Sequence, residues 1–152
     1  MPDSAPQVTI RAIESRDEAA WRGLWQLYNE FYERTVAEEV TAAAFSRFLD
    51  PTSTFSCAVA EQSDGALLGF VTWMPHPTTS SIEPALYLND LLVHPDSRCG
   101  GLGRRLIEHV YADADAKGAP NVYWHTQHFN HRAQLLYIKV GRLTDRRKYT
   151  RH

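Results

Sequence analysis

The feature of this 152-residue chain that most constrains its fold is a glycine-rich loop between an apolar segment and a helical pattern. The unit spans residues 88–110, LNDLLVHPDSRCGGLGRRLIEHV. Glycine permits positive φ angles and lets a phosphate approach the main chain. The helix that follows would present unpaired N–H groups and the positive end of its dipole. The segment therefore predicts a strand, a loop and a helix that can hold a pyrophosphate, with added positive charge from Arg98, Arg104 and Arg105.

A glycine-rich loop alone is weak evidence for a ligand, because it also makes a tight strand-to-helix turn. A dinucleotide fingerprint starting at Gly101 needs glycine where Leu106 stands, and no Gly-Lys-Ser or Gly-Lys-Thr of a nucleoside-triphosphate loop occurs. The spacing that fits is R-x-x-G-x-G, carried by Arg98, Gly101 and Gly103. The loop therefore disfavours nucleotide binding.

A second block lies in residues 130–141, NHRAQLLYIKVG. It has the pattern N-x-x-A-x-x-L-Y-x-x-x-G, carried by Asn130, Ala133, Leu136, Tyr137 and Gly141. The two motifs, in this order, resemble the coenzyme A motif and the next helix of the GNAT N-acetyltransferases. The resemblance covers residues 87–141 and looks most like the branch with yeast histone, polyamine and D-amino-acid acetyltransferases. One departure is Arg142, which stands where an aromatic residue often follows the last glycine.

The hydrophobic periodicity predicts a single α/β domain over residues 1–152. Strands are expected at 7–13, 54–61, 66–74, 85–93, 121–126 and, at the sheet edge, 144–150; helices are expected at 17–34, 40–49, from 102 to the glycine at 118, and 131–140. The resemblance implies the GNAT fold, in which about four helices flank a mixed central sheet with a splayed pair of central strands.

Composition excludes several other classes of protein. The formal charge of −2 and a pI near 6.4 give no reason to expect a nucleic-acid partner. No apolar run approaches the roughly 20 residues of a membrane helix, and the first residues do not read as a secretory signal. Cys57 and Cys99 lie far apart and suggest reduced thiols. We therefore expect a cytoplasmic protein that binds neither nucleic acid nor membrane.

The resemblance implies acetyl-CoA as cofactor, with its thioester in the splay between residues 90–93 and 121–126. Main-chain groups of Leu92 and Val93 would bind the pantetheine arm and polarise the thioester carbonyl. The other cofactor-binding residues that the two motifs carry over are Arg98, Cys99, Gly100, Gly101, Leu102, Gly103, Arg104, Asn130, Ala133 and Tyr137. Asn130 can also cap its helix, and the two roles are compatible.

Two residues are the candidates for proton transfer. Tyr137 is the candidate general acid, because a phenol stays protonated at neutral pH and can supply a proton to the leaving sulfur. Its alternative is a core tyrosine on an apolar helix face. Asp90 is the candidate base for the acceptor amine, since it interrupts an apolar strand. Its alternative is a structural aspartate at a strand bulge.

The acceptor pocket is less well defined by the sequence. The resemblance places the first two helices along it, and an aromatic box suits a cationic amine. The candidate contacts are Tyr28, Phe31, Tyr32, Asn89 and His125, the last also as a second base. His125, His128 and His131 do not match a zinc signature, so no metal site is expected.

These observations predict direct acetyl transfer from acetyl-CoA to a primary amine in a ternary complex. The acceptor could be a small amine, an amino acid, a polyamine or a protein lysine. The alternative is a non-catalytic acyl-CoA-binding regulatory module, which would bind CoA without turnover. The branch resemblance and the short region after residue 141 favour a homodimer.

Overall fold

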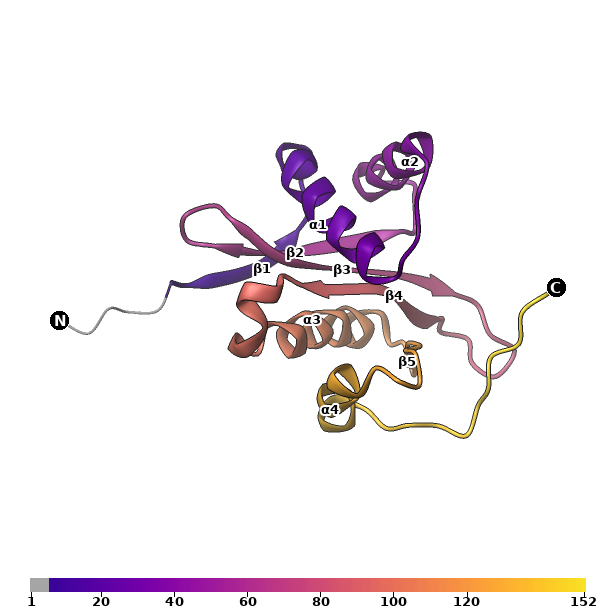
Figure 1. The fold of residues 1–152 in the computed structure, drawn as a ribbon. Coiled ribbons are helices and arrows are strands. Elements are labelled where there is room, and N and C mark those ends of the chain that lie inside the picture. The colour runs from indigo at the N-terminus through magenta and orange to yellow at the C-terminus, as the bar shows by residue number, and fades with distance from the viewer. Residues whose placement is uncertain (1–5) are drawn as a thin grey trace.

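The computed structural model describes residues 6–152, apart from the side chain of Cys99. It contains one five-stranded sheet with two helices on each face (Figure 1). The strands are β1 (Val8–Ala12), β2 (Ser56–Gln62), β3 (Leu67–His76), β4 (Ala85–Val93) and β5 (Val122–Tyr123). The helices α1 (Glu18–Phe31) and α2 (Glu38–Leu49) cover one face, and α3 (Leu102–Lys117) and α4 (His131–Val140) cover the other. This confirms the expected mixed sheet flanked by four helices.

The sheet order is β1-β2-β3-β4-β5, with antiparallel pairing from β1 to β4 and parallel pairing of β4 with β5. The turn between β2 and β3 contains Gly65 at φ 91°, a left-handed conformation that glycine adopts without a Cβ penalty. The hairpin predicted from the sequence is therefore present. Short 3₁₀ turns, Ser15–Asp17 and Pro95–Gly100, precede α1 and α3.

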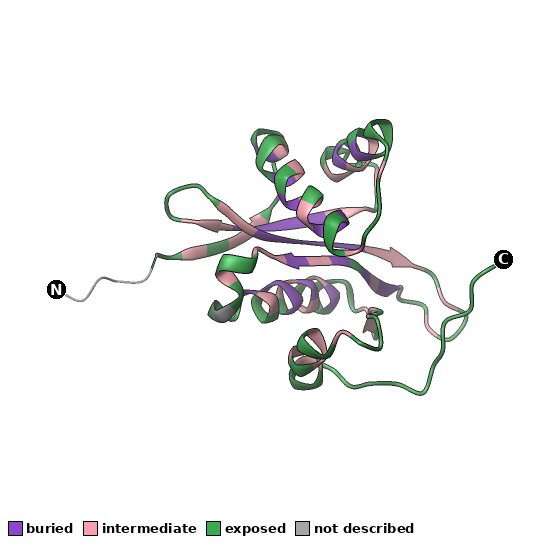
Figure 2. Ribbon diagram, viewed as in Figure 1, coloured by how far each residue is buried: buried purple, intermediate pink, exposed green. Residues whose placement is uncertain are grey.

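Two apolar cores lie on opposite faces of the sheet, and buried residues follow the sheet centre and the inner faces of the helices (Figure 2). The core under α3 includes Val71, Leu88 and Leu106. The core under α1 and α2 includes Trp21, Phe70 and Leu92. Burying each of these side chains contributes about 1.5–3 kcal/mol, so the two cores together fix the helices against the sheet.

A β-bulge in β4 changes which face its side chains occupy. The register pairs Trp73 with Leu88 and Thr72 with Asp90, so Asn89 has no partner on β3. Leu88 faces the α3 core, whereas Asp90 and Leu92 face the α1 side. Strict alternation would have put Leu88 and Asp90 on the same face. The extra residue therefore turns Asp90 toward α1.

The parallel strands β4 and β5 separate soon after they meet. They pair only at Leu86 with Val122 and at Tyr87 with Tyr123. β4 then continues to Val93 with no β5 partner among the described residues. This is the expected splay, but β5 is two residues long rather than the predicted 121–126, because past Tyr87 it has no neighbouring backbone to pair with.

The prediction of a strand at 144–150 was wrong. Residues 141–152, all of which the structure describes, form no strand and are exposed. A strand needs a neighbouring backbone, and the short β5 offers almost none. β5 is therefore an edge strand in this structure, and Leu143 and Tyr149 are each 91% exposed.

The helix predicted at 17–34 ends at Phe31, three residues early, for a local reason. Glu33 has φ 52°, and its N–H donates to the Glu30 carbonyl, while the N–H of Arg34 donates to the Asn29 carbonyl. This pair of bonds is a Schellman motif, which ends a helix and reverses the chain. Glycine usually takes the left-handed position, and Glu33 stands there instead, so no sequence signal marked the end of the helix.

Candidate active site

The N-terminus of α3 presents main-chain N–H groups with no side chain capping them. Gly101 is the residue before the helix, at φ 71°, and no acidic residue lies in the first turn. A Cβ built on Gly100 or Gly101 would project into open space. A helix start of this kind favours an anion by its dipole and its free donors. The geometry therefore fits the pyrophosphate of CoA.

The arginines near this helix start differ in their engagement. Arg98 is exposed. Arg104 pairs with Glu108 at 2.7 Å, and an Nη of Arg105 donates to the Val8 carbonyl at 2.8 Å. The side chain of Cys99, one of the predicted loop residues, lies outside the described part of the chain.

Gly103 has a packing role that the sequence did not reveal. A Cβ at this position would lie 2.9 Å from Cδ2 of Leu136 on α4. The absence of a side chain thus allows the helix of the second motif to rest directly against the start of α3. Leu102, next to Gly103, is buried in the sheet core. The two sequence motifs are therefore joined by a direct contact.

Asn130 is the N-cap of α4, and its Oδ1 accepts a hydrogen bond from the Ala133 N–H at 3.2 Å. The capping role expected for Asn130 is thus present. Its side-chain amide hydrogens have no acceptor among the hydrogen bonds of the described residues. The amide is free to bond to a ligand.

The main chain of β4 beside the splay is held in place from its other edge. Gly69 of β3 pairs with Val93, and a Cβ on Gly69 would lie 2.5 Å from the Leu92 carbonyl oxygen. No side chain larger than hydrogen fits there, since the obstacle is backbone. Leu92 and Val93 thus keep one edge paired with β3, and the edge facing the splay has no strand partner among the described residues.

Tyr137 is half-buried on α4, with its ring 5.5 Å from that of Trp124. Burial, with a smaller contribution from Tyr32 on α1, raises the pKa of Tyr137 to about 12. The phenol is therefore neutral throughout the physiological range.

Asp90 is 6% exposed and held by two hydrogen bonds. Its Oδ2 accepts from Oγ1 of Thr72 at 2.5 Å and from Nδ2 of Asn89 at 2.9 Å. The third neighbour is Tyr28, which is 7% exposed. Burial, followed by the charge of nearby Asp90, raises the pKa of the Tyr28 hydroxyl. The bulge and the hydrogen-bonded carboxylate are both features of the structural alternative, and the role of Asp90 as a base stays a prediction.

The predicted acceptor contacts fall into two groups. Tyr28 and Tyr32 lie beside Asp90 and Tyr137, and Phe31 is 51% exposed with its ring 5.0 Å from that of Tyr32. The cation over Tyr28 and Tyr32 is the chain's own Arg34, with Cζ 5.2 Å and 5.8 Å from the ring centroids. The aromatic box is therefore shared with a residue that sequence reasoning missed.

His125 forms a separate group at the meeting point of β4 and β5. Its Nδ1 lies 3.2 Å from the Tyr87 hydroxyl, and Tyr123 lies 2.7 Å from Nε2 of His76. Within residues 6–152 no three metal-ligating side chains gather in a way that could hold a metal ion. Thr72 and Tyr87 had no signal in the sequence, because only the strand register places Thr72 opposite Asp90, and only the fold brings Tyr87 to His125.

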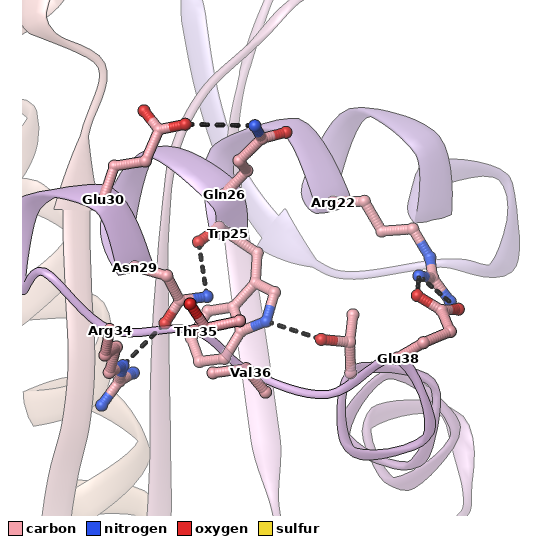
Figure 3. A pocket seen from close by; sticks show the side chains of 10 residues that line it. Arg22, Trp25, Gln26, Asn29, Glu30, Arg34, Thr35, Val36 and Glu38 are labelled. Carbon is pink, nitrogen blue, oxygen red and sulfur yellow. Dashed lines mark hydrogen bonds and ion pairs between the residues drawn. The ribbon is translucent and has the colours of Figure 1, made fainter.

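A cavity of about 420 Å³ opens between α1 and α2 on this side of the sheet (Figure 3). Its lining includes Trp25, Asn29, Arg34 and Thr41. Within it, Nε1 of Trp25 donates to Oγ1 of Thr41 at 3.0 Å, which joins the two helices. The cavity therefore lies against the aromatic cluster that leads to Asp90.

Comparison with known proteins agrees with this geometry. The sequence matches the acetyltransferase (GNAT) family over residues 21–141. It is 44% identical over 147 residues to the D-amino-acid N-acetyltransferase of Saccharomyces cerevisiae, covering 96% of this chain and 91% of that protein. It is 31% identical over 134 residues to an uncharacterized N-acetyltransferase of Bacillus subtilis, covering 88% and 89%.

Solved structures show the same fold. An aminoglycoside N-acetyltransferase in complex with CoA has a TM-score of 0.84 at 19% identity, covering 100% of this chain and 99% of that one. The ribosomal-protein-alanine N-acetyltransferase of Brucella melitensis has a TM-score of 0.81 at 20% identity, covering 96% and 99%.

The site and the fold define a transferase that uses a coenzyme A thioester. The chain belongs to the acetyltransferase (GNAT) family. It is an N-acetyltransferase with acetyl-CoA as the acetyl donor. In residues 6–152, no helix combines the length and apolar character needed to cross a membrane.

Proposed function

We propose that this enzyme acetylates the amino group of free amino acids, with D-amino acids as the preferred class. The geometric observation that carries direct transfer is the arrangement around the splay. The uncapped start of α3, the open edge of β4 and the Tyr137 phenol lie on one side, and Asp90 faces α1 on the other. The acceptor class is supported by the yeast relative, which acts on D-amino acids and is 44% identical to this chain.

The main chain carries most of cofactor binding in this proposal. The N–H groups of Leu102, Gly103 and Arg104 at the start of α3 receive the pyrophosphate, with Arg98 adding charge. The open edge of Leu92 and Val93 holds the pantetheine arm, and the free amide of Asn130 donates beside it. Bound acetyl-CoA supplies an acetyl thioester, whose carbonyl these donors polarise.

The acceptor must lose a proton before it can react. An alkylammonium with a pKa near 10.4 is less than about one part in a thousand neutral at pH 7. Asp90 is the group proposed to take this proton, directly or through a water molecule. Thr72 and Asn89 fix the position of its Oδ2. This leaves the carboxylate with a set orientation toward the side of the sheet that α1 covers.

Tyr137 is proposed to stabilise the departing sulfur. Its pKa of about 12 lies about 3.5 units above that of an ordinary thiol, so full transfer of its proton would be uphill by roughly 5 kcal/mol. A hydrogen bond donated to the developing thiolate has no such cost. Tyr137 therefore acts as a hydrogen-bond donor in the step, and solvent restores the thiol proton afterwards.

The direct test is release of free CoA thiol with a panel of D-amino acids, L-amino acids, polyamines and a lysine peptide. We expect steady thiol release with D-amino acids at a higher kcat/KM than with any other class. CoA binding without thiol release from any acceptor would instead establish the regulatory module. Gly101→Glu is the matched control, because a carboxylate at the helix start repels the pyrophosphate and should abolish both binding and turnover.

We also infer a homodimer, in which residues 141–152 lie against the partner subunit. This segment is exposed along its length, with Leu143 and Tyr149 the most exposed apolar residues in it, and the outer edge of β5 has no partner among the described residues. Light scattering of the full chain and of a chain ending at Gly141 tests this inference. A monomeric full chain would contradict it.

A cytoplasmic location is also proposed, since Cys57 is a free thiol.

A further inference from the structure

The C-terminal end of α1 holds Arg34 in a fixed place. Glu33 is the one non-glycine residue at positive φ among residues 6–152, at 52°. A left-handed conformation costs a non-glycine residue roughly 1–2 kcal/mol. The two hydrogen bonds to the Asn29 and Glu30 carbonyls maintain this conformation. The left-handed conformation of Glu33 reverses the direction of the chain, so that Arg34 lies back over α1.

The guanidinium group of Arg34 is anchored but has no acidic partner. Its Nε donates to Oδ1 of Asn29 at 2.7 Å, and Asn29 is itself held by a bond from its Nδ2 to the Trp25 carbonyl at 2.9 Å. Cζ lies 5.4 Å from the Trp25 ring centroid, in addition to its contacts with Tyr28 and Tyr32. No ion pair joins Arg34 to a carboxylate within residues 6–152.

The carboxylates that line the same cavity are already bound to other groups. Glu30 accepts from Nε2 of Gln26 at 3.1 Å, and Glu38 receives Nη1 of Arg22 at 2.9 Å (Figure 3). Arg22 is thus neutralised by Glu38 and by Glu18, whereas Arg34 keeps its charge and its two terminal nitrogens. An arginine held this way is prepared to bind a carboxylate in a bidentate manner.

One tyrosine ring lies between Arg34 and each of the proposed catalytic residues, Asp90 and Tyr137. The Tyr28 ring contacts Arg34, and the charge of Asp90 raises the pKa of its hydroxyl; the Tyr32 ring contacts Arg34, and Tyr32 raises the pKa of Tyr137. In an α-amino acid whose carboxylate is bound by a guanidinium, the amino nitrogen lies about 5–6 Å from that guanidinium. A carboxylate bound at Arg34 would therefore hold the acceptor amine within about 5–6 Å of the guanidinium, and Tyr28 is the residue that lies next to both Arg34 and Asp90.

We propose that Arg34 binds the α-carboxylate of the acceptor and so makes the enzyme selective for amino acids over amines that lack a carboxylate. The assignment rests on the proposed function, since it concerns the acceptor of the same site. Arg34 is a specificity-determining residue in this proposal and takes no part in the bond changes. Because the Arg34 guanidinium already stacks on three rings, less conformational entropy is lost when it binds a carboxylate, which favours tight binding of a small substrate.

The experiment compares Arg34→Gln and Arg34→Lys with the wild-type enzyme, using D-alanine and D-alaninamide as acceptors. The two acceptors differ in whether the carboxylate is present, and the variant-to-wild-type ratio for each removes their intrinsic difference in amine reactivity. We expect kcat/KM for D-alanine to fall about 10- to 100-fold in Arg34→Gln, mainly through KM, and by less in Arg34→Lys. For D-alaninamide we expect a change of less than about twofold.

Arg22→Gln is the matched control, because it removes a positive charge from the same cavity at a residue already paired with carboxylates. It should leave the ratio between the two acceptors unchanged. Equal losses on both acceptors in Arg34→Gln would assign Arg34 a structural role and overturn the inference. If that variant does not fold, an unchanged acceptor ratio in Arg34→Lys overturns it equally. A wild-type enzyme that acetylates D-alaninamide but no free amino acid would overturn the acceptor proposal itself.

Discussion

Leu136 on α4 packs against the bare Cα of Gly103 at the start of α3, so closely that a Cβ there would stand 2.9 Å from Leu136 Cδ2. The contact links the helix that carries Tyr137 to the helix start proposed to bind the pyrophosphate. Cofactor binding and the position of the Tyr137 phenol are therefore mechanically connected, although the two motifs lie some thirty residues apart in the chain.

Gly103→Ala should disturb this contact without unfolding the protein. The atom that a new methyl group would meet is the end of a flexible leucine side chain, so Leu136 can turn away at a cost of about 1 kcal/mol. We expect a modest loss of CoA affinity and a larger loss of kcat as α4 shifts. Calorimetric CoA titration and steady-state kinetics measure the two effects.

The double variant Gly103→Ala, Leu136→Ala provides the check on that explanation. Removing the leucine end creates space for the alanine methyl group, so the two substitutions should be less harmful together than their separate effects predict. Strict additivity of the two changes would show that the contact does not carry the effect.

Tyr137→Phe should lower kcat by about 100-fold while leaving CoA affinity nearly unchanged, because the lost hydrogen bond forms only as sulfur departs. Since burial raises the pKa of Tyr137 to about 12, its protonated form persists to higher pH than that of an ordinary phenol. The wild-type kcat profile should therefore show no descending limb below about pH 10.

Tyr111→Phe is the control for the loss of a buried hydroxyl. Tyr111 donates to the Val140 carbonyl at 2.7 Å, so its loss affects how α4 packs and not the splay. Turnover in Tyr111→Phe should remain within a few-fold of wild type. Unchanged kcat in Tyr137→Phe would remove the role assigned to its phenol.

Asp90→Asn should reduce kcat/KM by about 10- to 100-fold at pH 7. The deficit should narrow as the pH approaches the pKa of the acceptor amine, because an amine that is already neutral needs no base. Thr72→Val, which removes the hydroxyl that holds Oδ2, should give a smaller loss, and Thr72→Ser should restore activity. A deficit that is constant across the pH range would exclude Asp90 as the base.

The ion pair between Arg11 and Asp17 should make the free energy of unfolding depend on pH in the acidic range. The Arg11 hydrogen bonds outweigh burial and hold the pKa of Asp17 below its usual value. The carboxylate thus contributes stability above the unfolded pKa near 3.8, and this contribution is lost as the pH falls through the lower folded value. Asp17→Asn should cost roughly 1–3 kcal/mol at pH 7 in urea unfolding.

The difference between Asp17→Asn and wild type should shrink as the pH falls below 3.8 and through the lower folded pKa of Asp17, because the carboxyl is then protonated in both states. A difference that stays constant with pH would mean that packing, not charge, is lost. Asp64→Asn is an exposed comparison, since Asp64 lies in the β2–β3 turn and bonds only to nearby residues.

The sequence predicted the elements whose signals are local. The helices at 102–117 and 131–140 were predicted closely, because each combines a clear apolar period with glycine or asparagine at its boundaries, and the strand at 85–93 was predicted because a long apolar run ends before His94-Pro95. The strand at 144–150 was wrong, because pairing depends on a neighbour that a sequence pattern does not specify. Arg34 was missed because its position depends on Glu33, a residue that rarely adopts a left-handed conformation.

The unpaired residue Asn89 in β4 changes which face of the sheet the neighbouring side chains occupy. If Asn89 instead took part in a regular β3–β4 ladder with Leu88 still opposite Trp73, Asp90 would pair with Val71 and enter the apolar core beneath α3. If the register of Leu92 with Phe70 were held in such a ladder, Leu88 and Leu86 would turn out of that core. The interrupted ladder thus lets a single strand place leucines beneath α3 and a carboxylate beneath α1 at alternate positions 86, 88 and 90, which a regular strand would turn to one face.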